Sequence, residues 1–211
     1  MIELKRLARP LAAAVLAATL AAGLQGCVAM VVGGAAVGTL AATDRRTLGA
    51  QTEDKEIAAK ANIRLSKAIG DAGHVDVTSY NRKVLLTGEV HDEQMKQLAE
   101  NEVRQVTGVQ GVMNELEIIG NSSLTSRSSD ALITAKVSGS FVAEKGLNAN
   151  SIYVVTERGN VYLLGLVTDH EGRVAAEVTS GVSGVQRVIK MFEYISEDQL
   201  KSMNAMQGAR N

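Results

Sequence analysis

Val84-Leu85-Leu86-Thr87-Gly88-Glu89-Val90 and Val161-Tyr162-Leu163-Leu164-Gly165-Leu166-Val167 are two versions of one β-strand, and their recurrence decides the fold. Valine, glycine and valine stand at the same places in both, 77 residues apart. After one residue is dropped, Thr107-Gly108-Val109-Gln110 aligns with Ser183-Gly184-Val185-Gln186. A period this long exceeds that of solenoid repeats, so the sequence predicts two tandem copies of a small domain.

Each copy shows the same order of elements, α-β-β-α-β, read from periods of 3.6 residues for helices and of two for strands. In the first domain we predict helices over 53–69 and from Asp92 to Val106, and strands at about 75–79, 84–90 and 112–119. In the second domain we predict helices over 128–142 and 169–181 and strands at 151–156, 161–167 and 186–195. Thr168 and Glu171 fit a capping box at the start of the last helix.

Composition divides the rest of the chain. We predict a first domain over 52–119, a polar linker over 120–127, a second domain over 128–196 and a tail over 197–211 that is either disordered or a short helix. The predicted fold class is α+β, with two helices packed on a three-stranded mixed sheet in each domain. Residues 1–26 form a positively charged and then apolar stretch typical of an export signal, and 27–51 an apolar tether.

Cys27, the only cysteine in 211 residues, follows Leu24-Gln25-Gly26 directly after the apolar run. This arrangement resembles a bacterial lipobox, which implies that the sulfur of Cys27 carries a diacylglyceryl group and that Cys27 becomes the first residue after cleavage. The alternative is a buried free thiol behind an ordinary signal peptide. The apolar run is too short to be a stable spanning helix, whereas several acyl chains anchor a protein firmly. Val28 stands where an aspartate commonly retains lipoproteins in the inner membrane, so the resemblance favours the periplasmic leaflet of the outer membrane.

The order of elements, the hydrophobic-Gly-hydrophobic end of the second strand and the Gly-Val before the third strand resemble the BON domain, over residues 52–196. BON domains occur in envelope proteins, and the resemblance implies phospholipid binding. Together with the lipobox, the chain resembles the dual-BON outer-membrane lipoproteins. This resemblance implies binding of anionic phospholipid, such as phosphatidylglycerol, by the second domain and a role in outer-membrane integrity.

Charge distinguishes the two domains without reference to the family. Residues 52–119 carry a net charge of −4, and residues 128–196 a net charge of −1. An anionic bilayer therefore repels the first domain more strongly. The whole chain has a net charge of −1, which is not the balance of a nucleic-acid-binding protein.

Strand alternation gives a second asymmetry. In the first domain Leu85, Thr87 and Glu89 share one face of their strand, as expected for a sheet with a wet side. The corresponding face in the second domain carries Tyr162, Leu164 and Leu166 and is too apolar to be left in water. Its cover is the first domain or the C-terminal tail, or else a membrane or a protein partner.

The helix over 128–142 carries the predicted lipid-binding residues. Ile133, Val137 and Phe141 form its core stripe, whereas Leu132, Lys136 and Gly139 lie on the opposite side by the 3.6-residue period. An exposed leucine beside a lysine suits insertion at an anionic interface. We predict a lipid surface at or beside this face; its residues are Leu132, Lys136, Gly139, Phe141 and Val142. The same helical period makes Phe141 a core residue.

Catalysis finds little support in the sequence. His74, His91 and His170 lack the spacing of metal ligands, and acylation would consume Cys27. We therefore expect a protein that is not an enzyme and has no cofactor or metal. The alternative to lipid binding is an interaction module whose apolar sheet docks an outer-membrane assembly or peptidoglycan-associated partner.

Overall fold

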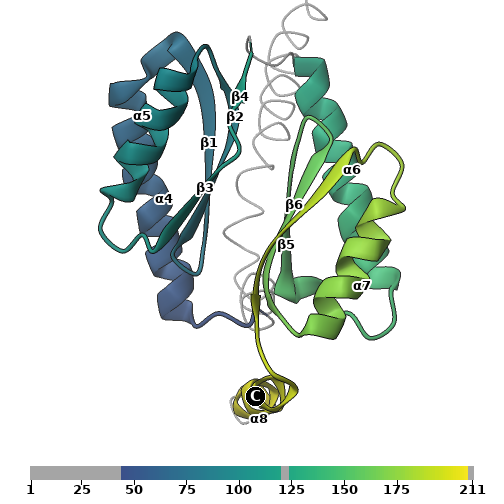
Figure 1. Ribbon diagram of the computed structural model, residues 1–211. Coiled ribbons are helices and arrows are strands. Elements are labelled where there is room, and N and C mark those ends of the chain that lie inside the picture. The colour runs from purple at the N-terminus through teal and green to yellow at the C-terminus, as the bar shows by residue number, and fades with distance from the viewer. Residues whose placement is uncertain (1–43, 120–123, 209–211) are drawn as a thin grey trace, which may run out of the picture. The chain divides into compact units, whose positions relative to one another are not determined.

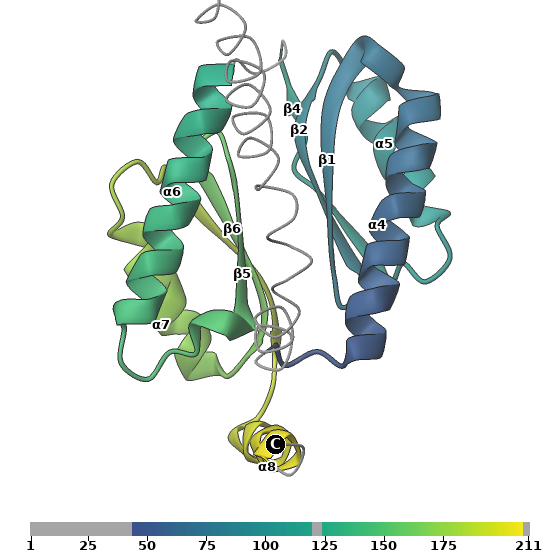
Figure 2. The ribbon, with the colours of Figure 1, turned by 180° about the vertical axis from the view of Figure 1, so that it is seen from behind.

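The computed structural model describes residues 44–119 and 124–208 of the chain (Figure 1). They form two α+β domains in the predicted order of elements, followed by a C-terminal helix. In each domain two helices lie on one face of a mixed sheet (Figure 2). Cys27 and the predicted signal and apolar tether up to residue 43 lie outside the described residues.

The first domain begins with helix α4 (Leu48–Ala68), earlier than predicted, because Thr47 caps it by accepting a hydrogen bond from the N–H of Ala50. A short 3-10 turn, η1 (Gly70–Ala72), leads into β1 (Gly73–Tyr80), which pairs antiparallel with β2 (Lys83–Val90). Helix α5 (Glu93–Arg104) is capped by Asp92, where the sequence predicts the start of this helix, and ends two residues before the predicted Val106. The sheet is completed by β3 (Gly111–Asn114) and β4 (Glu117–Ile118), both parallel to β2.

The last strand of the first domain, predicted as one segment, is broken at Asn114. Its side-chain oxygen accepts a hydrogen bond from the N–H of Leu116 at 3.3 Å, and its amide donates to the carbonyl of Lys96 at 2.8 Å. This local side-chain bonding competes with the strand ladder. The break turns Leu116 into the core, where it is 1% exposed.

The second domain repeats this order. Its elements are α6 (Leu124–Ala143), the 3-10 turn η2 (Ala149–Ser151), β5 (Ile152–Glu157), β6 (Asn160–Val167), α7 (Asp169–Ser180) and β7 (Arg187–Tyr194). Helix α6 begins inside the stretch predicted as a linker. Thr168 and Glu171 form the predicted capping box of α7. The tail, for which disorder and a helix were both open, forms helix α8 (Glu197–Gly208).

Each domain has its own hydrophobic core between its helices and one face of its sheet. In the first domain the α4 stripe of Ile57, Ala61 and Leu65 packs against the β2 face that carries Val84 and Leu86. In the second domain α6 contributes Ile133, Val137 and Phe141 to a core with Val161 and Leu163 of β6. The predicted core stripe of α6 is thus confirmed, and the stripe of α4 follows the same helical period.

The opposite faces of the two sheets are buried as well. Tyr80 and Leu85 of the first domain form one apolar cluster with Tyr162, Leu164 and Leu166 of the second, and Met203 of α8 packs against it. The first domain and the tail therefore take part in covering the apolar face of β6. The expectation of a wet side on the first sheet is wrong, because Leu85, Thr87 and Glu89 are at most 1% exposed.

Ion pairs surround this apolar cluster. Arg158 of the second domain lies 3.1 Å from a carboxylate oxygen of Glu117 and 3.7 Å from one of the fully buried Glu89. Arg187 contacts Glu115 at 3.0 Å. The sequence thus predicts that Glu89 faces solvent, whereas in the structure its carboxylate lies near the guanidinium group of Arg158 in the second domain.

Candidate functional site

The exposed side of α6 is the candidate site. Leu132 is 63% exposed and Val142 77% exposed, and Lys136 and Gly139 are exposed on the same helix. A Cβ built on Gly139 would meet no atom within 4 Å, so this part of the helix surface is open. Phe141 is 1% exposed and belongs to the core of the second domain. The accessible part of the predicted lipid surface is therefore made by the other four residues.

The corresponding helix of the first domain has a different surface chemistry. Asp54 of α4 and Asp130 of α6 hold the same position, because each accepts hydrogen bonds from two N–H groups of its own hairpin turn. This alignment places Glu56 at the position of Leu132 and Lys60 at that of Lys136. The two helices thus present the same lysine beside a carboxylate in one domain and beside an aliphatic side chain in the other.

Glu56 and Lys60 form an exposed ion pair of 2.5 Å, one helical turn apart. The hydrogen bond from Lys60 lowers the pKa of Glu56 from its ordinary value. On α6, the residues three and four positions from Lys136 are Leu132, Ile133, Gly139 and Ser140, none of them acidic. The ammonium group of Lys136 therefore has no neighbouring carboxylate on its own helix face and is available to an anion.

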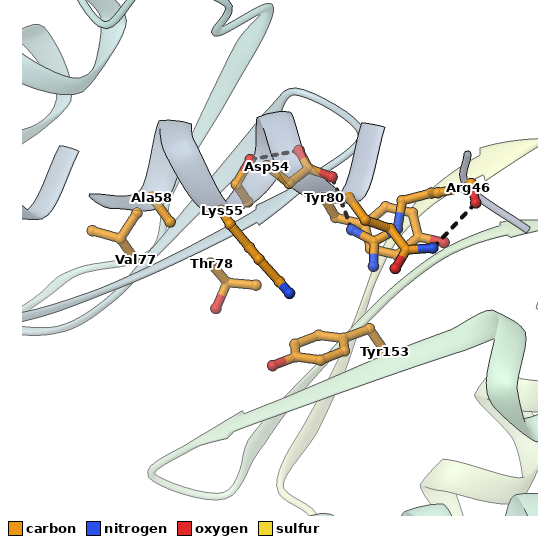
Figure 3. A pocket seen from close by; sticks show the side chains of 10 residues that line it. Arg46, Asp54, Lys55, Ala58, Val77, Thr78, Tyr80 and Tyr153 are labelled. Atoms are coloured by element: carbon orange, nitrogen blue, oxygen red, sulfur yellow. Dashed lines mark hydrogen bonds and ion pairs between the residues drawn. The ribbon is translucent and has the colours of Figure 1, made fainter. Parts of the chain in front are cut away.

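A pocket of about 250 Å³ lies between α4 and β1, with Tyr153 of β5 at its edge (Figure 3). Two of its three charged lining residues are engaged by the protein itself: Arg46 contacts Asp54 at 2.8 Å, and Asp54 also accepts a hydrogen bond from Ser79 at 2.8 Å, whereas the third is Lys55. Arg46, Asp54 and Ser79 of this pocket therefore have a structural role, and the exposed side of α6 is the stronger candidate for a binding site.

In residues 44–119 and 124–208 the structure contains no cluster of three or more His, Cys, Asp or Glu side chains that could hold a metal ion. Over the same ranges, no helix has the length and apolar character needed to cross a bilayer. Sequence reasoning located the exposed face of α6 from the helical period alone. It missed the Glu56 to Leu132 exchange, which an alignment of the two first helices would have revealed.

Comparison with known proteins places the two domains in a family. The chain is 38% identical over 174 residues to "Outer membrane lipoprotein DolP" of Haemophilus influenzae, covering 82% of this chain and 90% of that protein. It is 30% identical over 154 residues to "21 kDa hemolysin" of Actinobacillus pleuropneumoniae, covering 72% of this chain and 79% of that protein.

Among solved structures, CdsD, a structural protein of the type III secretion system of Chlamydia trachomatis, matches at a TM-score of 0.28 and 11% identity, over 68% of this chain and 96% of that chain. A likeness this weak carries no argument about function. The BON domain model, in contrast, matches residues 53–120 and 129–196, which correspond to the two α+β domains described above. The chain therefore belongs to the BON-domain family.

Proposed function

We propose that this protein is an outer-membrane lipoprotein that binds anionic phospholipid through the exposed face of α6 and thereby helps to maintain outer-membrane integrity. In this proposal acylated Cys27 anchors the chain in the periplasmic leaflet, and the protein is a binding module without catalytic activity. The similarity to a protein named as an outer-membrane lipoprotein supports the location. The lipobox-like Leu24-Gln25-Gly26-Cys27 supports the anchor.

The observation that carries lipid binding is the pair Leu132 and Lys136 on one exposed helix face, set against Glu56 and Lys60 on the other domain. An exposed leucine gains free energy when it enters the acyl region, and a lysine gains it when its ammonium group meets phosphate. A carboxylate at the leucine position removes the first gain and opposes the second. The difference accounts for lipid binding by one domain of two with the same fold.

The expected affinity of this face is modest. Full burial of a leucine contributes about 1.5–3 kcal/mol, and a lysine near an anionic surface about 1 kcal/mol. A few kcal/mol gives a dissociation constant on the order of millimolar. Attachment through Cys27 would raise the local concentration of α6 at the membrane to a similar range, so that the weak contact becomes effective.

The test is co-sedimentation of the protein, with Cys27 replaced by Ser to prevent acylation, with phosphatidylglycerol-containing and with neutral vesicles at low and high salt. We expect salt-sensitive binding to the anionic vesicles, abolished by Leu132→Glu. Ile63→Glu is the matched control, because Ile63 is 57% exposed on α4 of the first domain and the change adds the same charge. Circular dichroism of each variant establishes that it is folded.

Equal binding by wild type, Leu132→Glu and Ile63→Glu would overturn the assignment to α6. Loss of binding in both variants would mean that total charge, and not this face, decides attachment. The docking alternative required a free apolar sheet in the second domain, but Tyr162, Leu164 and Leu166 are at most 7% exposed. These three residues are therefore closed to a docking partner, and on the same face Tyr153, the cross-strand neighbour of Leu164, is 51% exposed.

A further inference from the structure

Two consecutive arginines precede the first domain and contact different domains. The guanidinium group of Arg45 donates to both carboxylate oxygens of Glu171 in α7, at 2.6 and 2.7 Å, and to the carbonyl of Leu166 at 2.7 Å. The side chains of Arg45 and Glu171 are 4% and 8% exposed. Arg45, which lies before α4, therefore forms a buried, bidentate ion pair with the second domain.

Arg46 attaches the same segment to the first domain. Its guanidinium carbon lies 4.0 Å from the centre of the Tyr80 ring, and the guanidinium group contacts the carboxylate of Asp54 at 2.8 Å (Figure 3). It also contacts the carboxylate of Asp44 at 2.6 Å. The hydroxyl of Tyr80 in turn accepts a hydrogen bond of 3.3 Å from the N–H of Leu166. Leu166 is thus bonded through its N–H to the first domain and through its carbonyl to Arg45.

The carboxylate at the third position of α7, Glu171, has no counterpart in the first domain. Its Oε2 accepts the N–H of Thr168 at 2.9 Å and completes the capping box at the start of α7. In the first domain Asp92 caps α5, and the residue three positions after it is Met95, which has no charge. The carboxylate that receives Arg45 is therefore a feature of one repeat and not a requirement of the fold.

We propose that Arg45 and Arg46 form a clasp that couples the two BON domains to each other and to the point where the tether enters, so that both domains move as one body. Arg46 contacts the first domain and Arg45 the second. Because the two residues are consecutive, the backbone between them cannot lengthen to let the domains separate. The hydrogen bonds and ion pairs of Arg45 and Arg46 given above do not involve α6. The clasp therefore does not depend on the proposed lipid surface.

The clasp is tested by measuring the distance between the domains in the full chain, purified in detergent. Spin labels are placed on exposed positions, at Asn101→Cys in α5 and Glu177→Cys in α7, and double electron-electron resonance gives the distance distribution. A chain with only one of the two cysteines corrects for any label at Cys27. We expect one narrow distribution in the wild-type background.

Arg45→Ala should broaden this distribution and add longer distances. Glu171→Gln keeps the volume of the side chain and the helix cap, and should broaden it as well even if Arg45→Ala folds poorly. The exchange of both charges, Arg45→Glu with Glu171→Arg, should narrow the distribution again relative to either single change. Arg173→Ala is the control on the same helix, because Arg173 forms an exposed ion pair with Asp169.

An unchanged distribution in both Arg45→Ala and Glu171→Gln would overturn the clasp and leave the apolar cluster as the coupling element. Broadening by Arg173→Ala to the same extent would do so too, since any loss of charge on α7 would then suffice. Vesicle binding measured on the same variants should equal that of the wild type. The clasp and the lipid surface can therefore fail independently.

Discussion

Asp54 and Asp130 perform the same structural task in the two domains. The carboxylate of Asp54 accepts hydrogen bonds from the N–H groups of Asn81 and Arg82 at 2.7 and 2.8 Å, and that of Asp130 from Arg158 and Gly159 at 2.8 Å each. All four turn residues have positive φ, between 48° and 76°. Each first helix thus stabilises a hairpin turn whose backbone conformation is otherwise unfavourable for Arg82 and Arg158, whereas Asn81 and Gly159 adopt it more readily.

We therefore expect Asp130→Ala to destabilise the second domain by about 1–3 kcal/mol, because the buried N–H of Gly159 and the partly buried N–H of Arg158 lose their acceptor. Chemical denaturation followed by circular dichroism measures the change. Asp169→Ala is the control, since the side chain of Asp169 is 80% exposed in its ion pair with Arg173. If Asp130→Ala and Asp169→Ala lost equal stability, the hydrogen bonds of Asp130 to the turn would not contribute the expected free energy.

The recurring glycines of β2 and β6 should tolerate no side chain. A Cβ on Gly88, where φ is 111°, would lie 2.2 Å from the carbonyl oxygen of His74, and one on Gly165 would lie 2.5 Å from that of Ser151. Since both obstacles are backbone atoms, we expect Gly88→Ala and Gly165→Ala to lose about 2 kcal/mol or more. Thermal unfolding provides the measurement.

Gly139→Ala, in contrast, should increase the stability of the second domain. Gly139 lies in α6 with open space around it, and alanine in a helix is more favourable than glycine by about 0.5–1 kcal/mol. A gain in melting temperature with unchanged vesicle binding would restrict the lipid surface to its larger side chains. A loss of stability would contradict the open environment at this position.

Lys136→Ala should weaken binding to phosphatidylglycerol vesicles about fivefold at low salt, since one lysine near an anionic surface contributes about 1 kcal/mol. Lys60→Ala should have no comparable effect, because Glu56 already pairs with Lys60 at the equivalent position. The difference between the two variants should shrink at high salt, where the membrane charge is screened. Equal weakening by both would assign binding to the overall charge of the chain.

The pair of Arg45 and Glu171 should contribute stability that depends on pH. Burial alone would raise the pKa of Glu171, but hydrogen bonds from Arg45 and from the N–H of Thr168 outweigh it and hold the pKa below the ordinary value of 4.5. A carboxyl group with a lowered pKa stabilises the folded state above its unfolded pKa and loses that contribution as the pH falls through its folded pKa. The stability difference between wild type and Glu171→Gln should therefore shrink below about pH 4.5. Denaturant titrations at pH 7 and at successively lower pH measure it; a constant difference would mean that the charge of Glu171 is not involved.

Periodicity predicted most of the fold and the need for a cover on the second sheet, but not that the corresponding face of the first sheet is buried as well. The stripes of Ile57 and Ile133 follow from local spacing, which is why both first helices and their cores were confirmed. Alternation predicted a wet face at Glu89, yet this residue is fully buried opposite Arg158. A polar residue on a strand indicates solvent only where no charged partner from a distant segment faces it.

Arg45 lay beyond sequence reasoning for a similar reason. It contacts a residue 126 positions later, and no local period predicts such a contact. The available indication was an asymmetry between the repeats, since the third residue of the last helix in each domain is glutamate in one and methionine in the other. The features that the two copies share thus explain the fold, whereas the differences between them are the basis of the two proposals made above.

The contact of Arg45 with Glu171 also changes what counts as a separable piece of this protein. Similarity places the start of the second BON domain at residue 129, but the cation for its buried carboxylate is supplied from before the first domain. A segment excised at that boundary, or transplanted into another protein, would lose the counter-ion of Glu171 and the residues of the first domain that cover Leu164 and Leu166. The segment to transfer intact in protein engineering is therefore the pair of repeats together with Arg45 and Arg46.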